Sequence, residues 1–555
     1  VLLKAMLEEL VRSQPLRTNP LAPAYFIEYA VHDGEMLSSS ATLGALVHTR
    51  RTRYRLPRLQ VRVGGYESDH TNFVGSEAYS GARWDVDQFP LDDSPAVLRH
   101  HLWLATDVAY KAAVEAMGRK RAVLGGIAPG EQLADLWRVE PLKKLEDVRP
   151  ERLDMEVWND RLRRLSGLFE NYPEVFQSVL ELDHTWGIHY LLNSEETVLR
   201  VPEHMMLVRV RAAAQAPDGM QLRDTSLFCA LSPAAMPSDL DLERGVRQVA
   251  ENLTALVRAP AGEAYTGPVL FEGVAGAQIL GEVLGRQFAV PRRPLSLPGR
   301  PAPFVASELE GRLGVRILPE WMDVVDDPTQ REWRGRPLFG HYRADLEGVA
   351  PAPVVLVEKG MLKNVLLTRQ PVRGFSGSNG HARLPGAFGA RMATIGNLFV
   401  RAAQSVPASE LRARLIELCR QRNKPYGVLI RKMDFPSSAS FEELRRMLAS
   451  SGGARPISSP VLAYRVYADG REELVRGLRF RNLNTRSFRD ILAASAETHV
   501  FDYLDSGAPL GITARVGYLA ECSVIAPAIL VDDLELERPQ DELTRLPLVP
   551  PPPLK

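Results

Sequence analysis

The chain has 555 residues, of which 45% are hydrophobic and 25% are charged, and its formal net charge is zero. This length is enough for two or more domains with a large core, and the composition is that of an ordinary globular protein. The neutral charge balance argues against a basic nucleic-acid-binding face, and no apolar run is long enough to cross a bilayer. A soluble protein is therefore expected. Because the chain starts at Val1, we expect a processed or trimmed form, cytoplasmic or exported.

Cysteine usage gives no framework for a disulfide or a metal site. The three cysteines, Cys229, Cys419 and Cys522, lie far apart, are odd in number and form no CxxC pair. This pattern favours buried free thiols over a metal or disulfide role, and it leaves the redox compartment open.

The N-terminal half begins with a helix and continues with strands. Leucine and methionine at helical spacing between residues 2 and 10 predict an amphipathic helix. Residues 25–31 are typical of a strand, and alternation over residues 37–65 predicts a curved antiparallel sheet with one wet face. Five arginines between residues 50 and 58 belong to these strands. Given the neutral total charge, a solvated strand face is favoured over a phosphate or nucleic-acid site.

Three more helices are predicted in this half. Ser94 followed by Pro95 marks a helix start, and that helix should run to about residue 121. A second helix is expected over residues 152–171, and Ser238 caps a third that ends near Pro260. We place the domain boundary there, so that residues 1–259 form the first domain.

Strands are predicted between the last two of these helices, over residues 175–182, 187–193, 196–201 and 205–214. His184 and His189 are five residues apart on or beside these strands. An odd spacing on a strand points side chains to opposite faces, so the two histidines should face opposite ways.

The C-terminal half opens with the segment around which the chain is organised, residues 265–286. A Gly-Pro turn and a short apolar run precede a helix-length segment in which Gly273, Ala277, Gly281 and Gly285 recur every four residues. Three glycines inside a helix cost roughly 1 kcal/mol each relative to alanine, so close approach of another backbone must compensate. The apolar residues among them predict a helix that is buried nearly all round.

Most of the remaining chain is strand and turn. Strands are predicted over residues 314–319, 354–360 and 362–368, with a hairpin turn at residues 358–360. Helices are expected over residues 409–421 and 488–495. The pattern as a whole predicts an α+β protein. Its N-terminal domain is a curved antiparallel sheet with helices, its β-rich C-terminal domain (residues 260–540) is built around one buried Gly-rich helix, and a Pro-rich tail covers residues 541–555.

Several of these segments resemble the TldD/PmbA family, metallopeptidase-like proteins once called modulators of DNA gyrase. Residues 265–286 resemble the family's signature helix, residues 321–327 (WMDVVDD) a family strand, and residues 374–397 a Gly-Asn-rich loop followed by an Arg-Met-Thr strand. The resemblance implies that the last segment borders a cleft for extended peptide. It therefore makes Gly380, Arg383 and Arg391 candidate substrate-binding residues.

The resemblance also implies a zinc site, whose residues this chain lacks. In active members a helix carries His-Glu, three residues and a second His, and this pattern falls here on Phe271, Glu272 and Gly276. A phenyl ring and a hydrogen atom offer no donor to zinc, which needs nitrogen, sulfur or oxygen. Cys522 lies too close to Pro527 to match the family's cysteine ligand. We therefore expect no zinc and no other cofactor, and Glu272 has no metal-bound water to deprotonate.

Three functions follow from this. The favoured one is a non-catalytic subunit that binds an extended peptide or pairs with another TldD/PmbA-family protein, as a homodimer or heterodimer, without nucleic acid or a membrane span. The alternative is an active metallopeptidase that cleaves unstructured peptides with an atypical metal site. A third possibility is a homodimeric scaffold without a peptide substrate.

Overall fold

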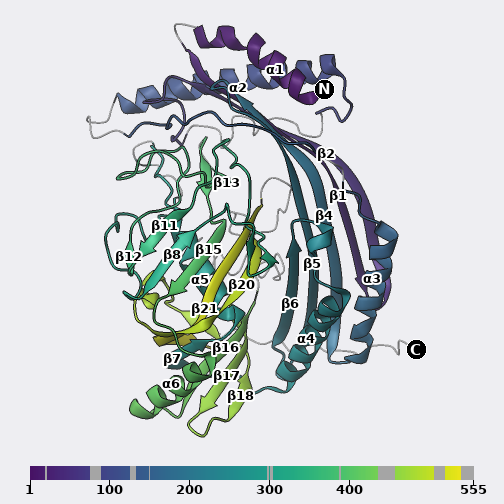
Figure 1. Ribbon diagram of the computed structural model, residues 1–555, viewed down its shortest axis with the longest axis vertical. Helices are drawn as coiled ribbons and strands as arrows, with labels where there is room; N and C mark the ends of the chain where they lie inside the picture. The colour runs from purple at the N-terminus through teal and green to yellow at the C-terminus, as the bar shows by residue number, and fades with distance from the viewer. Residues whose placement is uncertain are drawn as a thin grey trace.

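The computed structural model describes residues 1–18, 22–74, 89–125, 133–148, 151–296, 299, 304–386, 389–434, 457–505 and 519–538. The chain has a mixed α+β fold in which two large sheets lie side by side (Figure 1). The first sheet holds the strands up to residue 230, and the second holds most of those from residue 265 onward. The predicted Pro-rich tail, residues 541–555, lies outside the described residues.

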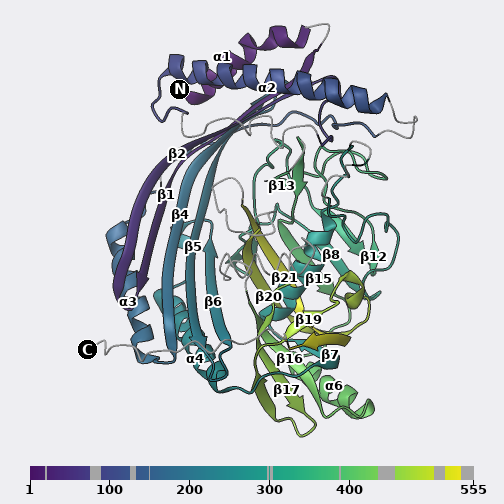
Figure 2. The same ribbon diagram turned by 180° about the vertical axis from the view of Figure 1, so that it is seen from behind.

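The first sheet is built from long strands that are mostly antiparallel. Its order is β2 (Ala45–Val63), β1 (Ala24–Thr42), β4 (Val175–Asn193), β5 (Val198–Gln215) and β6 (Gln221–Ala230), with the short β3 (Lys143–Leu145) parallel to β5. In both views this sheet curves around the second half of the chain (Figures 1 and 2). The predicted curved antiparallel sheet is therefore confirmed.

The predicted breaks within this sheet are wrong. Residues 175–193 form one strand instead of two, and residues 198–215 likewise form one strand. Gly187 and Pro202 suggest breaks in the sequence, but Gly187 pairs with Gly34 and Pro202 pairs with Ile188 inside the ladder. Pairing with neighbouring strands thus overrides the local preference of these residues.

Helices cover the outer face of the first sheet. They are α1 (Leu2–Arg12) and α2 (Pro95–Leu124) at one end, and α3 (Met155–Gly167) and α4 (Asp239–Arg258) at the other. Side chains of α3 and α4 share a core cluster with Leu182 of β4 and Val208 of β5. Because side chains alternate along a strand, His189 and Glu203 belong to the opposite face, which looks toward the second sheet.

Two predicted helix starts are confirmed, and one predicted helix is wrong. Ser94 and Ser238 are the N-cap residues of α2 and α4, as expected. The predicted helix over residues 488–495 is wrong, because a 3-10 helix ends at Phe488 and strand β20 begins at Ile491. None of the described helices is both long and apolar enough to span a bilayer.

The second sheet contains eleven strands and mixes parallel with antiparallel pairs. Its order is β12 (Met361–Leu362), β11 (Val354–Glu358), β8 (Met322–Asp326), β15 (Asn397–Ala402), β21 (Ala520–Glu537), β7 (Tyr265–Phe271), β16 (Tyr426–Met433), β17 (Pro460–Tyr467) and β18 (Glu472–Val475). β19 (Arg479–Arg481) and β20 (Ile491–Asp505) also pair with β21. Two small hairpins, β9 (Glu332–Trp333) with β10 (Arg336–Pro337) and β13 (Ala382–Pro385) with β14 (Arg391–Ala393), and helix α6 (Ala408–Gln421) complete this half.

The Gly-rich helix at the centre of this half is α5 (Val274–Val283), which follows β7 directly. All its residues from Ala275 to Val283 are buried, which confirms the predicted buried helix. The expected cost of three helical glycines is wrong. Gly273 precedes the helix with φ 61°, and Gly285 lies in the following 3-10 helix, so only Gly281 of those three is inside α5.

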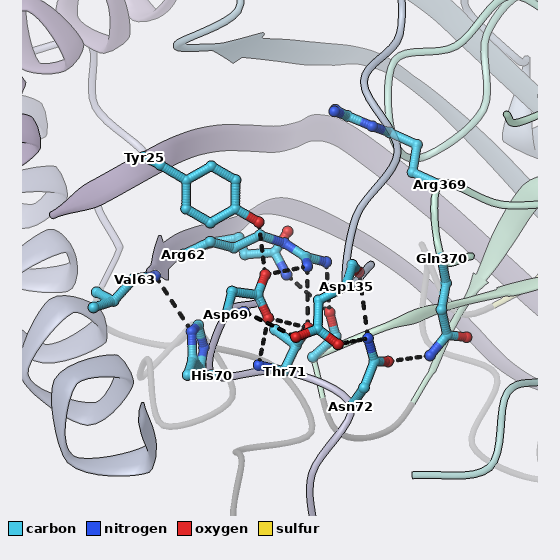
Figure 3. Close-up of polar contacts among 12 residues, drawn as sticks. Tyr25, Arg62, Val63, Asp69, His70, Thr71, Asn72, Asp135, Arg369 and Gln370 are labelled. Carbon is cyan, nitrogen blue, oxygen red and sulfur yellow. Dashed lines mark hydrogen bonds and ion pairs between the residues drawn. The ribbon is translucent and has the colours of Figure 1, made fainter. Parts of the chain in front are cut away.

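A buried polar network joins the two halves of the chain near one end of the first sheet (Figure 3). Arg62 donates to the Asp69 carboxylate at 2.8 Å and to the Gly389 carbonyl at 3.0 Å. Asn72 accepts a hydrogen bond from Gln370 of the second half. These contacts hold the curved sheet at a fixed position over the second sheet, and the space that remains between them contains the candidate site.

Candidate functional site

A cavity of about 610 Å³ lies between the inner face of the first sheet and the C-terminal half. Its sheet wall includes His32 of β1, His189 of β4 and Glu203 of β5. Its opposite wall includes Arg383 of β13 and Glu521 of β21. A concave space of this size between two domains, with converging polar groups, is the usual form of a ligand site.

Three side chains on the sheet wall form a compact cluster. His32 and His189 face each other across β1 and β4, and their rings lie 4.3 Å apart between centroids. Glu203 lies on the next strand, and its carboxylate is 2.8 Å from His32 Nδ1 and 3.2 Å from His189 Nδ1. One ligand atom of each residue lies within 4.8 Å of those of the other two, a spacing that can hold a metal ion.

Two glycines lie beside this cluster on the same face of the sheet. Gly34 of β1 and Gly187 of β4 pair directly across the strands, and Glu203 pairs with Gly187 on the other side. A Cβ at Gly34 would lie 2.6 Å from the Trp186 carbonyl oxygen, and a Cβ at Gly187 would lie 3.0 Å from the Asp33 carbonyl oxygen. The missing side chains leave room for the Tyr54 hydroxyl, which would lie 2.7 Å from a Cβ at Gly34 and 3.3 Å from a Cβ at Gly187.

The electrostatics of the cluster favour a neutral His32 beside a charged Glu203 carboxylate. Burial lowers the pKa of His32 to about 4, and Glu203 opposes this shift only in part. Burial alone would raise the pKa of Glu203, but the two histidines hold it well below its ordinary value. Neutral imidazoles with an ionised carboxylate are the protonation states in which these side chains bind metal ions.

The opposite wall contains one of the three predicted substrate-binding residues. Arg383 lines the cavity, but its guanidinium is occupied within the protein. It donates to the Glu521 carboxylate at 3.0 Å and to the Ile395 carbonyl at 3.0 Å, and it stacks on Tyr342 at 4.2 Å from the ring centroid. Arg383 therefore shapes the wall and orients Glu521.

The other two predicted residues, Gly380 and Arg391, are not among those that line the cavity. Arg391 is buried and forms an ion pair with Glu28 of β1 at 3.0 Å, so it joins the two halves of the chain. Gly380 has φ +74°, and its carbonyl accepts a hydrogen bond from Tyr342 at 2.6 Å. Whether either residue touches a substrate stays a prediction.

The positions matched to the family's His-Glu pattern lie away from this cavity. Phe271 is the last residue of β7, Glu272 lies between β7 and α5, and only Gly276 is on the helix. Glu272 accepts hydrogen bonds from Arg431 at 2.6 Å and from Arg412 at 3.1 Å. Burial raises the pKa of Glu272, but these two arginines outweigh it, so its pKa lies below the ordinary value.

These positions do not fit a zinc ion. Phe271 is fully buried with its ring 5.8 Å from that of Phe480, and Gly276 has no side chain. A Cβ at Gly276 would lie 2.5 Å from the Pro527 carbonyl oxygen, so packing excludes any larger residue there. The three positions together offer one carboxylate, whereas catalytic zinc requires about three protein donors.

Shifting the pattern along the helix gives no better donor set. Glu282, the only glutamate inside α5, accepts hydrogen bonds from Gln278 and from the Ser458 hydroxyl, both at 2.8 Å. Laid on Glu282, the pattern places Gly281 and Arg286 where imidazoles would be required. Neither residue supplies the nitrogen lone pair that binds zinc.

All three cysteines are free thiols, and Cys419 and Cys522 are buried, whereas Cys229 is only partly covered. Cys522 lies on β21, where its Sγ is 3.2 Å from the Ile395 carbonyl oxygen and burial raises the pKa of its thiol. A thiol in this state is a poor metal ligand, because metals bind the thiolate.

No sequence pattern singles out His32 or Glu203, and for His189 the spacing predicts only that it faces away from His184. It is correct that His184 and His189 face opposite ways, because only His189 lines the cavity. The relevant partner of His189 is 157 positions away, across β1 and β4. A signal does exist: His32-Asp-Gly34 and Gly187-Ile-His189 are mirror images, as two antiparallel strands with paired histidines and paired glycines require.

Comparison with known proteins points to one family. Residues 266–432 match the PmbA/TldA metallopeptidase C-terminal domain. A metalloprotease from Methanothermobacter thermautotrophicus is 28% identical over 179 residues, which is 32% of this chain and 36% of that protein. A metalloprotease from Archaeoglobus fulgidus is 37% identical over 81 residues, which is 15% of this chain and 18% of that protein. The chain thus matches about a third of the first relative and under a fifth of the second.

The likeness in fold extends over nearly the whole chain. The crystal structure of TldE from Thermococcus kodakarensis superimposes with a TM-score of 0.57 and covers 96% of this chain and 99% of its own. The sequence identity over this superposition is 14%, so it supports the fold alone.

Proposed function

Because this chain belongs to the TldD/PmbA family, we propose that it is a metallopeptidase-like protein that binds peptide or a partner subunit without performing zinc-dependent cleavage at the family position. The family membership concerns fold and ancestry, and catalysis needs separate support from the site. The activity, the peptide and the partner are therefore all part of the proposal.

One observation carries this proposal: Gly276 is packed so closely against Pro527 that position 276 has no room for a metal-binding side chain. The nearby acid, Glu272, is held by Arg412 and Arg431 instead of facing a substrate. A general base needs a water or substrate proton within hydrogen-bond reach, and these contacts direct Glu272 elsewhere. The scaffold is thus consistent with a family member that retains binding without hydrolysis.

The cavity between the sheets is where the peptide would bind. Its volume of about 610 Å³ falls in the range of known ligand pockets, about 300–1,000 Å³. Its walls combine apolar residues such as Met36 with polar groups such as Thr185, which suits the mixed character of an extended peptide. The binding step would not need Glu272.

A binding assay with a cleavage readout tests this proposal. Purified protein is titrated with a library of labelled unstructured peptides, and binding is followed by fluorescence anisotropy. Met36→Arg places a long cation in the cavity and should weaken binding at least 10-fold, whereas Val47→Arg, at a site 61% exposed on the same hairpin, should not. Mass spectrometry should find the peptides intact after incubation with added zinc. Cleavage, or equal effects of the two variants, would contradict the proposal.

The partner is tested separately. Pull-down of the tagged chain from its native source, followed by light scattering of the purified protein, distinguishes a heterodimer with a second family member from a homodimer. A homodimer that binds none of the peptides would favour a scaffold role. A monomer that never associates with a relative would contradict the partner-subunit role.

An active metallopeptidase with an atypical metal site is the second candidate, and one observation favours it. Among the residues that the structure describes, His32, His189 and Glu203 form a donor set with the composition of a catalytic zinc site. Chelator-sensitive cleavage of an unstructured peptide, abolished by Glu203→Gln and unaffected by Glu272→Gln, would establish this alternative in place of the first.

A further inference from the structure

The His32–His189–Glu203 cluster has chemistry that neither the fold nor the peptide-binding proposal explains. The His32 and His189 residues are only 2% and 5% exposed. In each ring Nδ1 lies against the Glu203 carboxylate, while the buried Nε2 has no hydrogen-bond partner. The Glu203 carboxylate is thus the hydrogen-bond partner that both rings share, and one carboxylate between two buried imidazoles calls for a functional explanation.

The positions of the three side chains are fixed by strand pairing instead of by a flexible loop. His32 and His189 are direct partners in the β1–β4 ladder, and Glu203 is the partner of Gly187, two residues from His189 on the same face. All three residues therefore lie on one patch of one sheet, with other strands on both sides. A site built on paired strands is held more precisely than one built on loops.

The two distances from the carboxylate to the imidazoles match those between the ligands of a small metal ion. Metal–ligand bonds of about 2.0–2.1 Å place the ligands of a tetrahedral ion roughly 3.3 Å apart. The carboxylate lies 2.8 and 3.2 Å from the two Nδ1 atoms, so small movements would let an ion replace the shared protons.

The chemical type of the three donor atoms determines which metal ions the site can bind. Two imidazole nitrogens and one carboxylate suit zinc and neighbouring transition metals, whereas magnesium and calcium prefer oxygen donors throughout. Three protein donors leave a coordination position open, as in catalytic rather than structural zinc sites. All three residues line the cavity, so the open position would face the space where a ligand enters.

We propose that His32, His189 and Glu203 form a binding site for one divalent transition-metal ion of the zinc class, open to the cavity between the two sheets. The site lies on the N-terminal sheet and shares no residue with the family pattern on residues 271–276. The proposal goes beyond the proposed function and does not depend on it, because the chain can hold an ion here with or without cleaving a peptide.

Metal binding by the full chain tests the site directly. Protein freed of metal with a chelator is titrated with zinc by calorimetry and with cobalt by visible absorption, which reports the coordination geometry. One ion per chain is expected. Glu203→Gln keeps the shape of the side chain but removes its charge, and His189→Gln removes one imidazole. Each should weaken zinc binding by about 100-fold or more, since even residues that only support metal ligands contribute about 10–100-fold.

A matched control exists in the same cavity. His48 also lines it and hydrogen-bonds Ser40 at 2.8 Å, but it lies outside the cluster. His48→Gln should leave zinc affinity unchanged, and circular dichroism should show all variants folded. No zinc binding by the unmodified chain, or equal affinity in Glu203→Gln and the unmodified chain, would overturn the proposal. Loss of binding in His48→Gln or Glu272→Gln alone would place the ion elsewhere and also overturn it.

Thermal unfolding gives a second measurement that does not require a fully native variant. A ligand that binds only the folded state raises its stability by RT ln(1 + [L]/Kd). Zinc should therefore raise the melting temperature of the unmodified chain and of His48→Gln, but not that of Glu203→Gln or His189→Gln. Equal zinc-induced shifts in all four proteins would contradict the site. Cleavage assays are independent of this readout, so failure here leaves the peptide-binding proposal standing.

Discussion

The two regions of this molecule that carry glutamate near a possible metal position are built in opposite ways. At the start of α5, Glu272 is paired with two arginines and its neighbour Gly276 is packed against Pro527. On the inner face of the first sheet, Glu203 lies between two histidines beside a cavity. The family pattern directs attention to the first region, but the donor chemistry is found in the second. A segment that resembles a family pattern and a cluster that can bind a metal ion need not coincide in one chain.

Restoring the family histidine at position 276 is the strongest test of this contrast. A Cβ there would lie 2.5 Å from the Pro527 carbonyl oxygen, so Gly276→His and even Gly276→Ala must displace β21 or α5. We expect Gly276→Ala to lose about 1–3 kcal/mol of stability and Gly276→His to lose more. Chemical denaturation followed by circular dichroism measures both.

The control for this prediction is a helical glycine with open space around it. A Cβ at Gly118 of α2 meets nothing within 4 Å. Gly118→Ala should therefore be neutral or stabilising by up to about 1 kcal/mol, because alanine is the better helix former. If Gly276→Ala were as harmless as Gly118→Ala, the region around α5 could accommodate a side chain and the contrast with the cavity would fail.

Glu272, beside α5, and Glu347, near the cavity, should respond oppositely to pH. Near the cavity, burial raises the pKa of Glu347 from 4.5 to about 7, and Glu347 in turn helps to raise that of Asp345, which lines the cavity. The folded chain therefore retains a proton that the unfolded chain releases, and stability falls as pH rises from about 4.5 to about 7. Glu347→Gln removes this loss while its amide oxygen can still accept the hydrogen bond from the Arg369 backbone N–H.

Melting temperatures across pH measure this effect. Glu347→Gln should melt higher than the unmodified chain at pH 8, by roughly 1–2 °C for each kcal/mol regained, and the difference should shrink toward pH 4.5. A variant that is less stable than the unmodified chain at pH 8 would show that Glu347 is charged and favourably paired in the fold.

The sequence predicts the elements of this protein better than it predicts the site. The N-caps at Ser94 and Ser238 and the buried character of α5 follow from local patterns, because capping and helical periodicity act within a few residues. The single strand over residues 175–193 does not follow, because pairing with β1 and β5 overrides Gly187 as a breaker. Where the local propensity of a residue and its pairing with neighbouring strands disagree, the sequence alone shows only the local propensity.

The cavity cluster was missed for the same reason. His32, His189 and Glu203 come from three strands, and no local spacing such as HxxxH connects them. Their proximity depends on the register of the β1–β4 and β4–β5 pairs, and a shift of one residue would move a whole set of side chains to the other face. The mirrored His32-Asp-Gly34 and Gly187-Ile-His189 segments contain this information. They become readable only once the two strands are known to pair.

The smallest expected change in stability is that of Glu272→Gln. This variant also distinguishes most clearly between the roles of Glu272 and Glu203. Burial opposes ionisation of Glu272, but Arg431 and Arg412 lower its pKa below the ordinary value. Its pairing with the arginines thus stabilises the fold fully above the ordinary pKa, and this stabilisation is lost as pH falls from there through the lowered pKa of the folded chain. The side chain of Glu272 is 26% exposed. Glu272→Gln should therefore cost no more than about 1 kcal/mol at neutral pH, less in high salt, and nothing once the carboxyl is protonated. Denaturation at neutral pH and at a pH where the carboxyl is protonated should show that Glu272→Gln lowers stability only at neutral pH. Calorimetric zinc titration should show unchanged zinc affinity in Glu272→Gln, whereas Glu203→Gln should lose zinc affinity. If Glu272→Gln lost zinc affinity instead, the family position would be the metal site after all, and the assignment of roles to the two regions would be reversed.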